Sequence, residues 1–470
     1  MTEQTNPLGT EKVWKLLMKF SIPAIIGMVV NALYNIVDRI FIGNASDLGF
    51  NGLAGITIGF PIMIIQLSLG ILFGVGGATL FSMKLGEGKK KDADEVLGNV
   101  FTLLICSGVI FSLCGEIFLI PILHLFGASN TVLPYAVDYM RIILIGSCFQ
   151  IIGLGLNNFL RADGQPKLAM ITMFIGAGTN IILDPIFIYI FKMGMAGAAL
   201  ATIISQCISM IWTLTYFLNP NRVHKIRIKY MILKKKIVYR IISLGLPSFL
   251  LQVSNSILNI ILNKSLLFYG GDLAVSGMGI INSVQTILLM PITGLIQGVQ
   301  PIVSFNYGAK QYDRIKLAEK LAIIAATIIV IIGWIVTRMI PSQIIQLFNQ
   351  EVELIQFGSY ALITWFWCLP LIGFQILAAN FFQAVGRSKS AMVLTLTRQV
   401  LLLMPAIVIF PYFWGLDGIL YAAPFADGLS ALITGVWFYF GIRSLSESNV
   451  QSFKEVNVVK LASVDSKEEL

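Results

Sequence analysis

Charged residues are scarce in this chain: Asp, Glu, Lys and Arg make up 12% of its 470 residues, while hydrophobic residues make up 56%. A soluble globular protein of this length needs a largely polar surface, and this sequence has too few polar residues to cover one. The scarcity of charge therefore excludes an ordinary soluble globule. Lipid must surround much of the folded chain.

Histidine and cysteine are also rare, with two and five residues respectively. Cys106, Cys114, Cys148, Cys207 and Cys368 lie inside apolar runs without paired spacing, which is typical of packed free thiols and not of disulfides or metal ligands. The sequence contains no phosphate-binding loop, no Cys/His metal spacing and no nucleophile elbow. The chain is therefore not expected to be an enzyme.

Long apolar runs are abundant. A helix that rises about 1.5 Å per residue needs about 20 residues to cross a hydrocarbon core of roughly 30 Å, and barrel strands would instead alternate apolar and polar residues. The first run is too long for a signal-peptide core and lacks a small-residue cleavage site, so we expect an uncleaved first helix. The predicted spans lie near 15–41, 52–83, 96–121, 133–160, 167–191, 195–218, 240–264, 274–305, 318–340, 356–384, 391–413 and 418–442.

Lysine and arginine collect on one side of this series of spans. Examples are Lys84, Lys89, Arg161, Arg314 and Arg387, whereas the opposite loops carry almost none. By the positive-inside rule, both termini and the basic loops are predicted to be cytoplasmic. The net charge of +9 then reflects topology and contact with anionic lipid, and no nucleic-acid partner is expected.

The two halves of the chain repeat each other. Residues 159–170 match residues 381–392 at six of twelve positions, and Gly86 aligns with Gly308 at the same shift of 222 residues. Chance is a poor explanation for that many matches at one offset. The sequence therefore predicts a duplicated membrane protein.

The repeat also predicts how the chain is divided. We expect an N-terminal six-helix lobe at 1–218, a basic cytoplasmic linker at 219–239, a C-terminal six-helix lobe at 240–443 and a polar cytoplasmic tail at 444–470. The linker is expected to be a solvated connection.

The predicted fold is an all-α polytopic membrane protein with 12 transmembrane helices in two six-helix lobes. Because six is an even number, both halves enter the membrane in the same direction and are related by a pseudo-two-fold axis along the membrane normal. Two such lobes form a cleft between them, and rocking them exposes the cleft to each side alternately. This is the architecture of a transporter.

Two carboxylates are predicted to lie inside the membrane. Asp38 follows Phe20 by 18 residues, or about 27 Å from the cytoplasmic edge, and Asp184 follows Lys167 by 17 residues, or about 26 Å. A carboxylate at the centre of a span costs about 3 kcal/mol and needs a partner, a proton or water. The two acids are expected at similar depth in the first lobe.

Other oxygen atoms are predicted near these acids. Asn180 shares a helix face with Asp184, Thr202 lies at a similar depth in the sixth span, and Pro185 bends the fifth span and frees the carbonyl of Ile181. Such a set suits a hard cation such as Na⁺, or a proton held by one of the two acids. The alternative is a satisfied hydrogen-bond cluster between helices.

The repeat provides an internal control for this cluster. The second half has apolar residues at the equivalent positions, namely Leu262, Leu401, Pro405 and Ala423. Only the first half retains the polar set. This asymmetry favours a coupling-ion site at Asp38, Asn180, Asp184 and Thr202 over a shared structural feature.

The second half contains a polar pair of its own. Arg398 in the eleventh span and Asp427 in the twelfth are both predicted near the middle of the membrane. We expect a neutralising ion pair between adjacent helices, and Arg398 is the only base predicted to lie deep. Amide, Met and aromatic surfaces can bind flat amphipathic cations, and the candidates for a substrate cavity are Asn31, Tyr34, Asn35, Asn157, Met173, Asn259 and Asn282.

Three stretches carry a family resemblance: Pro23 to Gly43, Arg161 to Pro166 and Asn180 to Pro185. With the six-plus-six repeat, they resemble the multidrug and toxic compound extrusion (MATE) family, and within it a branch of bacterial multidrug exporters. The resemblance covers nearly the whole chain. The combination is specific, although none of these stretches would be specific alone.

The resemblance implies a V-shaped pair of lobes that exports cationic or amphipathic drugs in exchange for Na⁺ or H⁺. It implies the same ion site at Asp38, Asn180, Asp184 and Thr202, no cofactor besides the coupling ion, and a monomer in the plasma membrane of a bacterium. Another branch also relies on acids in the seventh and tenth spans. This sequence has none there, which argues against that branch.

Two other functions are compatible with a polytopic membrane protein. A related flippase for lipid-linked oligosaccharides would carry an anionic diphosphate and need bases along the cleft, but the interior of the first lobe is acidic. A membrane scaffold or receptor predicts neither the repeat nor buried acids in one lobe. The sequence does not decide between Na⁺ and H⁺.

Overall fold

The computed structural model describes residues 6–45 and 49–468, with side chains described in those ranges except at 35, 36, 39, 43, 44, 49–51 and 446–468. Helices are the only regular elements in the described ranges. The first half contains α1 (Pro7–Thr10), α2 (Val13–Asn44), α3 (Gly49–Gly86), α4 (Lys90–Leu125), α5 (Leu133–Ile145), α6 (Ser147–Ala162), α7 (Pro166–Pro185), the π-helical η1 (Ile186–Ile190) and α8 (Gly194–Leu218). The second half contains the 3-10 segment η2 (Ile228–Tyr230), α9 (Lys235–Gly308), α10 (Tyr312–Met339), α11 (Pro341–Gln346), α12 (Val352–Trp365), α13 (Leu369–Ala384), α14 (Ser388–Leu396), the π-helical η3 (Thr397–Leu403), α15 (Met404–Ile409) and α16 (Pro411–Glu468).

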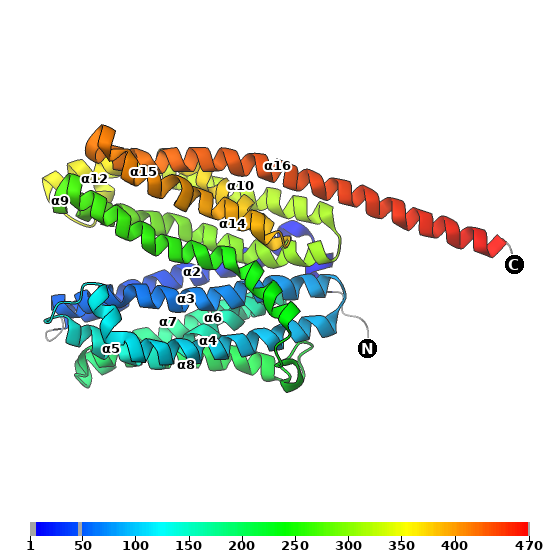
Figure 1. The fold of residues 1–470 in the computed structure, drawn as a ribbon, viewed down its shortest axis with the longest axis horizontal. Helices are drawn as coiled ribbons and strands as arrows, with labels where there is room; N and C mark the ends of the chain where they lie inside the picture. Colours follow the sequence, from blue (N-terminus) through cyan, green and yellow to red (C-terminus); the bar gives the residue numbers. More distant parts are fainter. Residues whose placement is uncertain (1–5, 46–48, 469–470) are drawn as a thin grey trace.

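The predicted twelve-span fold is confirmed. Within the described residues, nine helical segments are long and apolar enough to cross a membrane, and two bent pairs add further spans: α5 with α6 at 53°, and α12 with α13 at 48°. The long helix α9 contains two spans because the chain turns back at Gly271, whose φ of 63° suits glycine. Figure 1 shows α9 crossing the bundle and returning.

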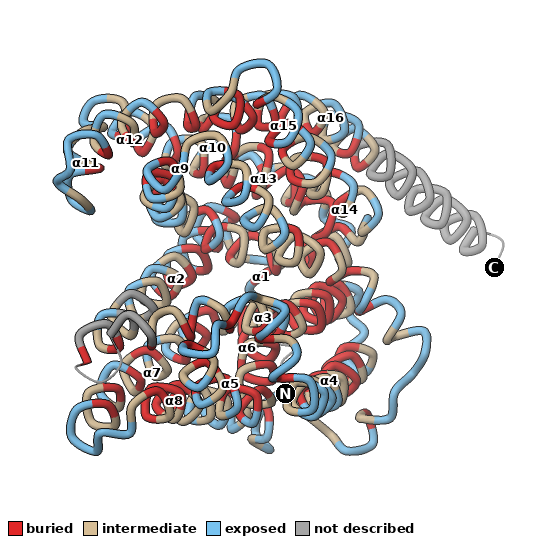
Figure 2. The backbone as a smooth tube through the Cα atoms, turned by 60° about the vertical axis from the view of Figure 1, so that its left-hand side comes forward, coloured by how far each residue is buried: buried red, intermediate tan, exposed pale blue. Residues whose placement is uncertain are grey.

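The spans form two lobes, the N-lobe (α2 to α8) and the C-lobe (α9 to α16), which lie one above the other in Figure 1. Figure 2 shows the same division from another direction. The fourth span of each lobe is the bent pair, and the fifth span of each contains a π-helical segment, η1 or η3. The lobes therefore share one plan, as the six-plus-six repeat predicts.

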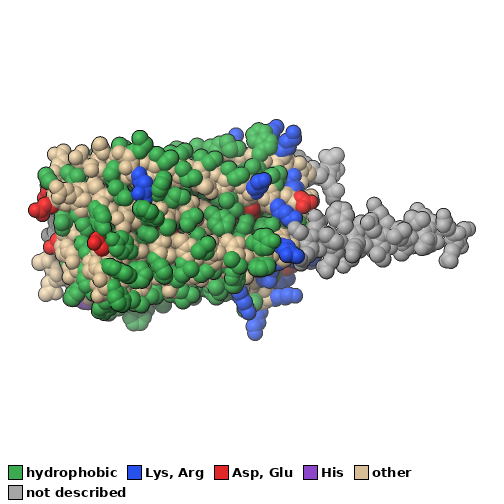
Figure 3. All heavy atoms as spheres, turned by 90° about the horizontal axis from the view of Figure 1, so that it is seen from above, with side chains coloured by type: hydrophobic (Ala, Val, Ile, Leu, Met, Phe, Trp, Pro, Cys, Tyr) green, Lys and Arg blue, Asp and Glu red, His purple; other side chains and the backbone are tan. Residues whose placement is uncertain are grey.

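Most of the Lys and Arg side chains lie at one end of the bundle, which we call the basic end. The helix α2 begins there, α3 ends there, and α9 begins and ends there. Lys12, Lys84, Lys89, Lys235 and Lys310 belong to this end. Figure 3 shows basic side chains gathered beside the grey tail and a hydrophobic belt between the two ends of the bundle.

The belt consists of exposed hydrophobic side chains. On α4, the side chains of Ile110, Leu113 and Ile117 are 61%, 60% and 71% exposed. Residues three and four apart share one face of a helix, so this face of α4 is continuously apolar. Such a surface is unfavourable in water and suits the hydrocarbon of a lipid bilayer.

Buried hydrophobic clusters show where the lobes meet. One cluster belongs to the N-lobe alone and includes Ile42 and Ala199, and another belongs to the C-lobe alone and includes Leu262 and Ala426. The largest cluster contains residues of both lobes and lies toward the basic end; its members include Phe20, Phe81, Phe159, Val299, Ile302 and Phe381. Among the residues that the structure describes, the core that the lobes share therefore lies in this half of the bundle.

Glycines let the backbones of the two lobes touch at the basic end. Gly86 lies against the carbonyl of Phe305, and Gly308 lies against the carbonyl of Met83. Met83 and Phe305 are related by the same 222-residue shift as the two glycines, so these contacts are equivalent under the repeat. We call these four residues the glycine seam, because a Cβ at either glycine would overlap the opposing carbonyl oxygen.

Hydrogen bonds join the lobes in the same region. Gln300 Nε2 of the C-lobe donates to Thr79 Oγ1 of the N-lobe at 2.8 Å, and Arg314 Nη2 donates to the carbonyl of Glu11 at 2.7 Å. Among the described residues, the hydrogen bonds and glycine contacts between the lobes all lie in the half near the basic end. This half of the bundle holds the lobes together.

The segment between the lobes is packed against the N-lobe. Asn99 of α4 donates to the carbonyl of Tyr230 at 3.0 Å, and His224 Nδ1 lies 2.9 Å from Asp94 Oδ1. Both Asn99 and His224 are buried. Side chains of α4 therefore hold this connection in place, while most of its residues between 219 and 239 are exposed or half-buried.

Two helix boundaries differ from the predicted divisions of the chain. The helix α9 begins at Lys235, inside the range 219–239 predicted for the linker. The helix α16 continues to Glu468, through most of the range 444–470 predicted for a polar tail. Polar composition alone did not reveal either helical stretch.

Candidate ion site in the N-lobe

Three helices bring the predicted ion-site residues together. Asp38 comes from α2, Asn180 and Asp184 from α7, and Thr202 from α8. The helix α7 packs against both α2 and α8. Asn180, Asp184 and Thr202 are buried, and Asp38 is half-buried.

The two acids face each other. The carboxyl group of Asp184 is fully buried and lies within hydrogen-bonding reach of the carboxyl group of Asp38. Asn180 Nδ2 donates to Asp184 Oδ1 at 3.3 Å, one helical turn away. A buried ionised carboxylate repels a second one beside it strongly, so this pair of one buried and one half-buried acid needs a shared proton or a bound cation.

The amide of Asn180 leaves an acceptor beside the acid pair. Its Oδ1 atom is buried and has no hydrogen-bond partner among the described residues. A buried acceptor without a donor is unfavourable, and a cation would satisfy it. Carboxylate and amide oxygens are the ligands that hard cations prefer. The residues present therefore fit either a small cation or a proton.

Tyr139 is a fourth-span residue that the sequence reasoning did not identify. It lies on α5, is buried, and hydrogen-bonds with the hydroxyl of Thr202, close to Asp38 and Asp184. Thr202 Oγ1 also donates to the carbonyl of Ala198 at 3.0 Å. The repeat could have identified Tyr139, because the residue 222 positions later is Ala361.

The regular geometry of α7 ends at this cluster. Pro185 directly follows Asp184 and has no N–H to continue the helical hydrogen bonds. The π-helical η1 begins at the next residue. A π-helical turn changes the direction of the side chains near it and often accompanies a functional site.

The candidates for a substrate cavity on α2 lie close to the acid pair. Asn31 and Tyr34 are half-buried and precede Asp38 on the same helix, and Tyr34 also lies near Tyr139. The side chain of Asn35 lies outside the described residues. These positions would border the ion site.

The other two candidates for a substrate cavity in the N-lobe, Asn157 and Met173, lie between packed helices of this lobe. Asn157 is buried and donates to the carbonyl of Ala169 at 2.9 Å, which ties α6 to α7. The thioether of Met173 lies over Gly27 and packs α7 against α2. Both contacts lie inside the lobe.

The candidates in the C-lobe lie on the two spans of α9. Asn259 is exposed and its Nδ2 atom donates to the carbonyl of Asn255 at 3.0 Å. Asn282 is half-buried, and its carbonyl accepts a hydrogen bond from the hydroxyl of Thr286 at 2.8 Å. Asn255 also hydrogen-bonds with Gln399.

Arg398 and Asp427 lie next to each other in the C-lobe. Arg398 Nε donates to Asp427 Oδ1 at 2.7 Å, and the Asp427 side chain is 2% exposed. A buried ion pair with this geometry neutralises both charges. Arg161, in the last turn of α6, is 3% exposed and lies between the lobes, because the C-lobe covers it.

Comparison with known proteins agrees with the resemblance found in the sequence. The MatE family model matches residues 23–186 and 247–409, one segment in each half. A multidrug export protein, MepA, of Staphylococcus aureus (strain MSSA476) is 29% identical over 432 residues, covering 92% of this chain and 94% of that protein.

Solved structures share the fold. A MATE multidrug transporter, DinF-BH, has a TM-score of 0.87 and 39% sequence identity, covering 93% of this chain and 98% of that one. A MATE structure in complex with MaD3S has a TM-score of 0.89 and 26% identity, covering 95% of this chain and all (100%) of that one. The similarity extends over both lobes.

Proposed function

We propose, from the premise that this chain belongs to the MatE family, that it is a secondary active transporter that exports cationic and amphipathic compounds from a bacterial cell. The MepA protein is described as a multidrug export protein and DinF-BH as a MATE multidrug transporter. The family model matches one segment in each half of this chain, which supports a transporter built from two related halves.

The observation that carries this proposal is the acid pair formed by the half-buried Asp38 and the buried Asp184. An occupant that neutralises the pair removes the repulsion between the two carboxyl groups, so its arrival and departure change the energy of the N-lobe. A cation gradient can then drive the exchange of a bound drug for a bound coupling ion. We propose Na⁺ or H⁺ as the coupling ion, held by Asp38, Asn180, Asp184 and Thr202.

The contacts between the lobes support alternating access. The basic end is proposed to be cytoplasmic, with both termini there, by the positive-inside rule. Because the lobes share their core and their glycine seam at that end, the arrangement described here is closed toward the cytoplasm. Separation of the lobes at the seam would open the cytoplasmic side.

The acid pair lies beyond the shared core, toward the far end of the N-lobe. A drug cation that reaches Asn31 or Tyr34 would come close to the same acids, so drug and coupling ion would compete for one negative charge. Because binding of the coupling ion displaces the drug, this competition exchanges one for the other without a separate drug site that must be coupled to the ion site. A flippase for lipid-linked oligosaccharides is not favoured, because an anionic cargo would be repelled by these acids.

The test is ethidium efflux from proteoliposomes in which Na⁺ and pH gradients are imposed separately. We expect efflux to follow one gradient, and the Asp38→Asn and Asp184→Asn variants to lose it while their yield in the membrane stays unchanged. The control is Asp272→Asn, which removes an exposed acid of the C-lobe. Wild-type efflux from both N-lobe variants would show that coupling occurs elsewhere.

A further inference from the structure

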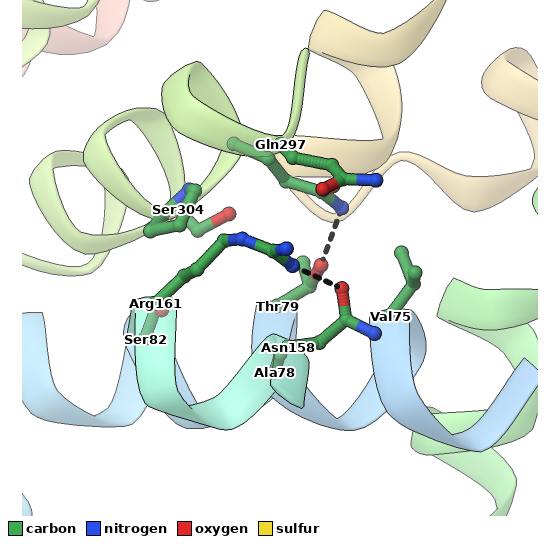
Figure 4. Close-up of a pocket in the computed structure, with 10 residues that line it drawn as sticks. Val75, Ala78, Thr79, Ser82, Asn158, Arg161, Gln297 and Ser304 are labelled. Atoms are coloured by element: carbon green, nitrogen blue, oxygen red, sulfur yellow. Dashed lines mark hydrogen bonds between the residues drawn. The ribbon is translucent and has the colours of Figure 1, made fainter. Parts of the chain in front are cut away.

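A small polar cavity lies between the two lobes near the basic end. It is lined by residues of α3 and α6 from the N-lobe and of α9 from the C-lobe. Its free space is about 20 Å³, which is the room that one water molecule or one small ion needs. Figure 4 shows the side chain of Arg161 extending across this cavity toward Gln297 and Ser304.

Arg161 is buried here and has no acidic partner in the part of the chain that the structure describes. Its side chain is 3% exposed, and its Nη2 atom has no hydrogen-bond partner among the described residues. Its Nη1 atom donates to Asn158 Oδ1 at 3.4 Å, a long contact. The cavity lining contains no Asp or Glu. A buried guanidinium needs compensating negative charge, because desolvation of a single charge is strongly unfavourable.

Other donors in the cavity are available as well. Ser82 Oγ is buried and has no hydrogen-bond partner in the described part of the chain. Thr79 Oγ1 accepts from Gln300 Nε2, so its own hydrogen can point into the cavity. Arg161, Ser82 and Thr79 therefore present donors to the same small space, and this set suits a negative occupant.

The second half of the repeat shows that the fold does not require this charge. The residue equivalent to Arg161 is Gln383, a neutral side chain whose Nε2 atom donates to the carbonyl of Leu244 at 2.7 Å. The residue equivalent to Ser82 is Ser304, which donates to the carbonyl of Ala384 at 2.9 Å. The C-lobe satisfies these side chains with its own carbonyls, whereas Arg161 Nη2 and Ser82 Oγ of the N-lobe have no partner among the described residues.

We propose that this cavity binds a small monovalent anion of the size of chloride, held by Arg161 with the hydroxyl groups of Ser82 and Thr79. The last turn of α6 supplies some negative potential to Arg161 through its terminal carbonyls, but this is only a partial charge. One water could fill the space without neutralising the guanidinium. A chloride ion fits the space and supplies the missing charge.

An anion at this position would also link the lobes. Arg161, Ser82 and Thr79 belong to the N-lobe, whereas Gln297, which also borders the cavity, belongs to the C-lobe. The Gln297 Oε1 atom has no partner among the described residues, and a turn of its amide would present its Nε2 atom to the anion. Separation of the lobes would take this site apart, so the anion favours the arrangement with the basic end closed.

The test measures anion binding by thermal unfolding of the purified protein. Melting is followed by tryptophan fluorescence in sodium chloride and in sodium gluconate at equal sodium concentration and ionic strength, so that any Na⁺ site is equally occupied. We expect a saturable rise in melting temperature with chloride, absent in Arg161→Gln and requiring more chloride in Ser82→Ala. The control Arg141→Gln, which alters an exposed arginine paired with Glu116 on the same lobe, should keep the wild-type response.

A second measurement does not depend on variants that fold. Crystals grown with bromide should show an anomalous peak beside Arg161 Nη2. Equal melting temperatures in chloride and gluconate for the wild type would mean that water fills the cavity and would overturn the proposal. A chloride response that survives in Arg161→Gln would also overturn it, because the anion would then act elsewhere. Both measurements report binding, so neither depends on the outcome of the efflux assay.

Discussion

Alanine at Gly86 or Gly308 should separate the basic ends of the two lobes. The added Cβ at Gly86 would overlap the carbonyl oxygen of Phe305 and stand 2.8 Å from Ala309 N. Moving that nitrogen to an ordinary contact distance of 3.4 Å takes a shift of about 0.6 Å, and the nearer carbonyl oxygen of Phe305 must move farther than this. The opposing atoms are backbone atoms of a packed helix. The repeat predicts the same result at Gly308, where the Cβ would stand 2.9 Å from the carbonyl carbon of Met83.

The magnitude follows from the cost of overpacking. An extra methyl group in a tightly packed contact destabilises it by about 1–3 kcal/mol. Only the closed arrangement contains this contact, so the equilibrium should shift toward an open basic end by roughly five- to 150-fold. Glycine to alanine in a helix also stabilises the helix by about 0.5–1 kcal/mol, but this gain applies to both arrangements.

The assay is the distance between spin labels at positions 91 and 320, two exposed lysines at the basic end of the N-lobe and the C-lobe. Labelling uses a background in which the native cysteines are replaced. Gly86→Ala and Gly308→Ala should each lengthen and broaden the distance distribution and slow efflux. Gly279→Ala is the matched control, because a Cβ there has no atom within 4 Å. A wild-type distance distribution in both seam variants would refute the reasoning.

Three further outcomes are expected. Tyr139→Phe removes the hydroxyl that hydrogen-bonds with Thr202. The half-saturating concentration of coupling ion for efflux should therefore rise about two- to tenfold, which is the effect of one net hydrogen bond. An unchanged concentration would show that Tyr139 is not part of the site. Asp427→Asn leaves Arg398, whose side chain is 16% exposed, without its partner and should lower the free energy of unfolding by about 3–5 kcal/mol while efflux per folded molecule persists. A stable, inactive variant would instead make the pair functional. Burial raises the pKa of Asp163 to about 6 from 3.8. Between these values the folded state retains a proton that the unfolded state releases, so the free energy of unfolding should fall as pH rises from about 4 to 6. Asp163→Asn should flatten that part of a melting-temperature profile, and an unchanged slope would contradict this role.

The spans could be predicted because lipid imposes a simple requirement on them. A helix in hydrocarbon must be long and apolar, and α4 and α10 show this in the sequence without reference to any other part of the chain. The interruptions inside spans were harder to predict. The bends between α5 and α6 and between α12 and α13 lie within continuous apolar runs, where composition gives no signal.

Part of the candidate ion site could be predicted from two features of the sequence: the depth of each acid along its span, and the absence of these acids from the second half of the repeat. Asp38 and Asp184 are the acids that counting along helices places at one depth, and the structure brings their carboxyl groups together. Tyr139 and Arg161 were not predicted as members of a site. Tyr139 looks like ordinary packing, and Arg161 looks like a loop residue until the second lobe covers it.

The symmetric and asymmetric parts of the repeat have different physical roles. The glycine seam is symmetric, because each lobe needs the same close approach to the other, and Gly86 and Gly308 supply it. The C-lobe folds with Leu262 and Gln383 where the N-lobe has Asp38 and Arg161, so the helical scaffold does not require either charge. A buried charge that the scaffold does not neutralise must be neutralised by an ion from solution. The energy of the N-lobe would then depend on which ions are bound. The ion in the cavity would extend this dependence to the contact between the lobes at the glycine seam. An ion gradient could use this dependence to move one lobe against the other.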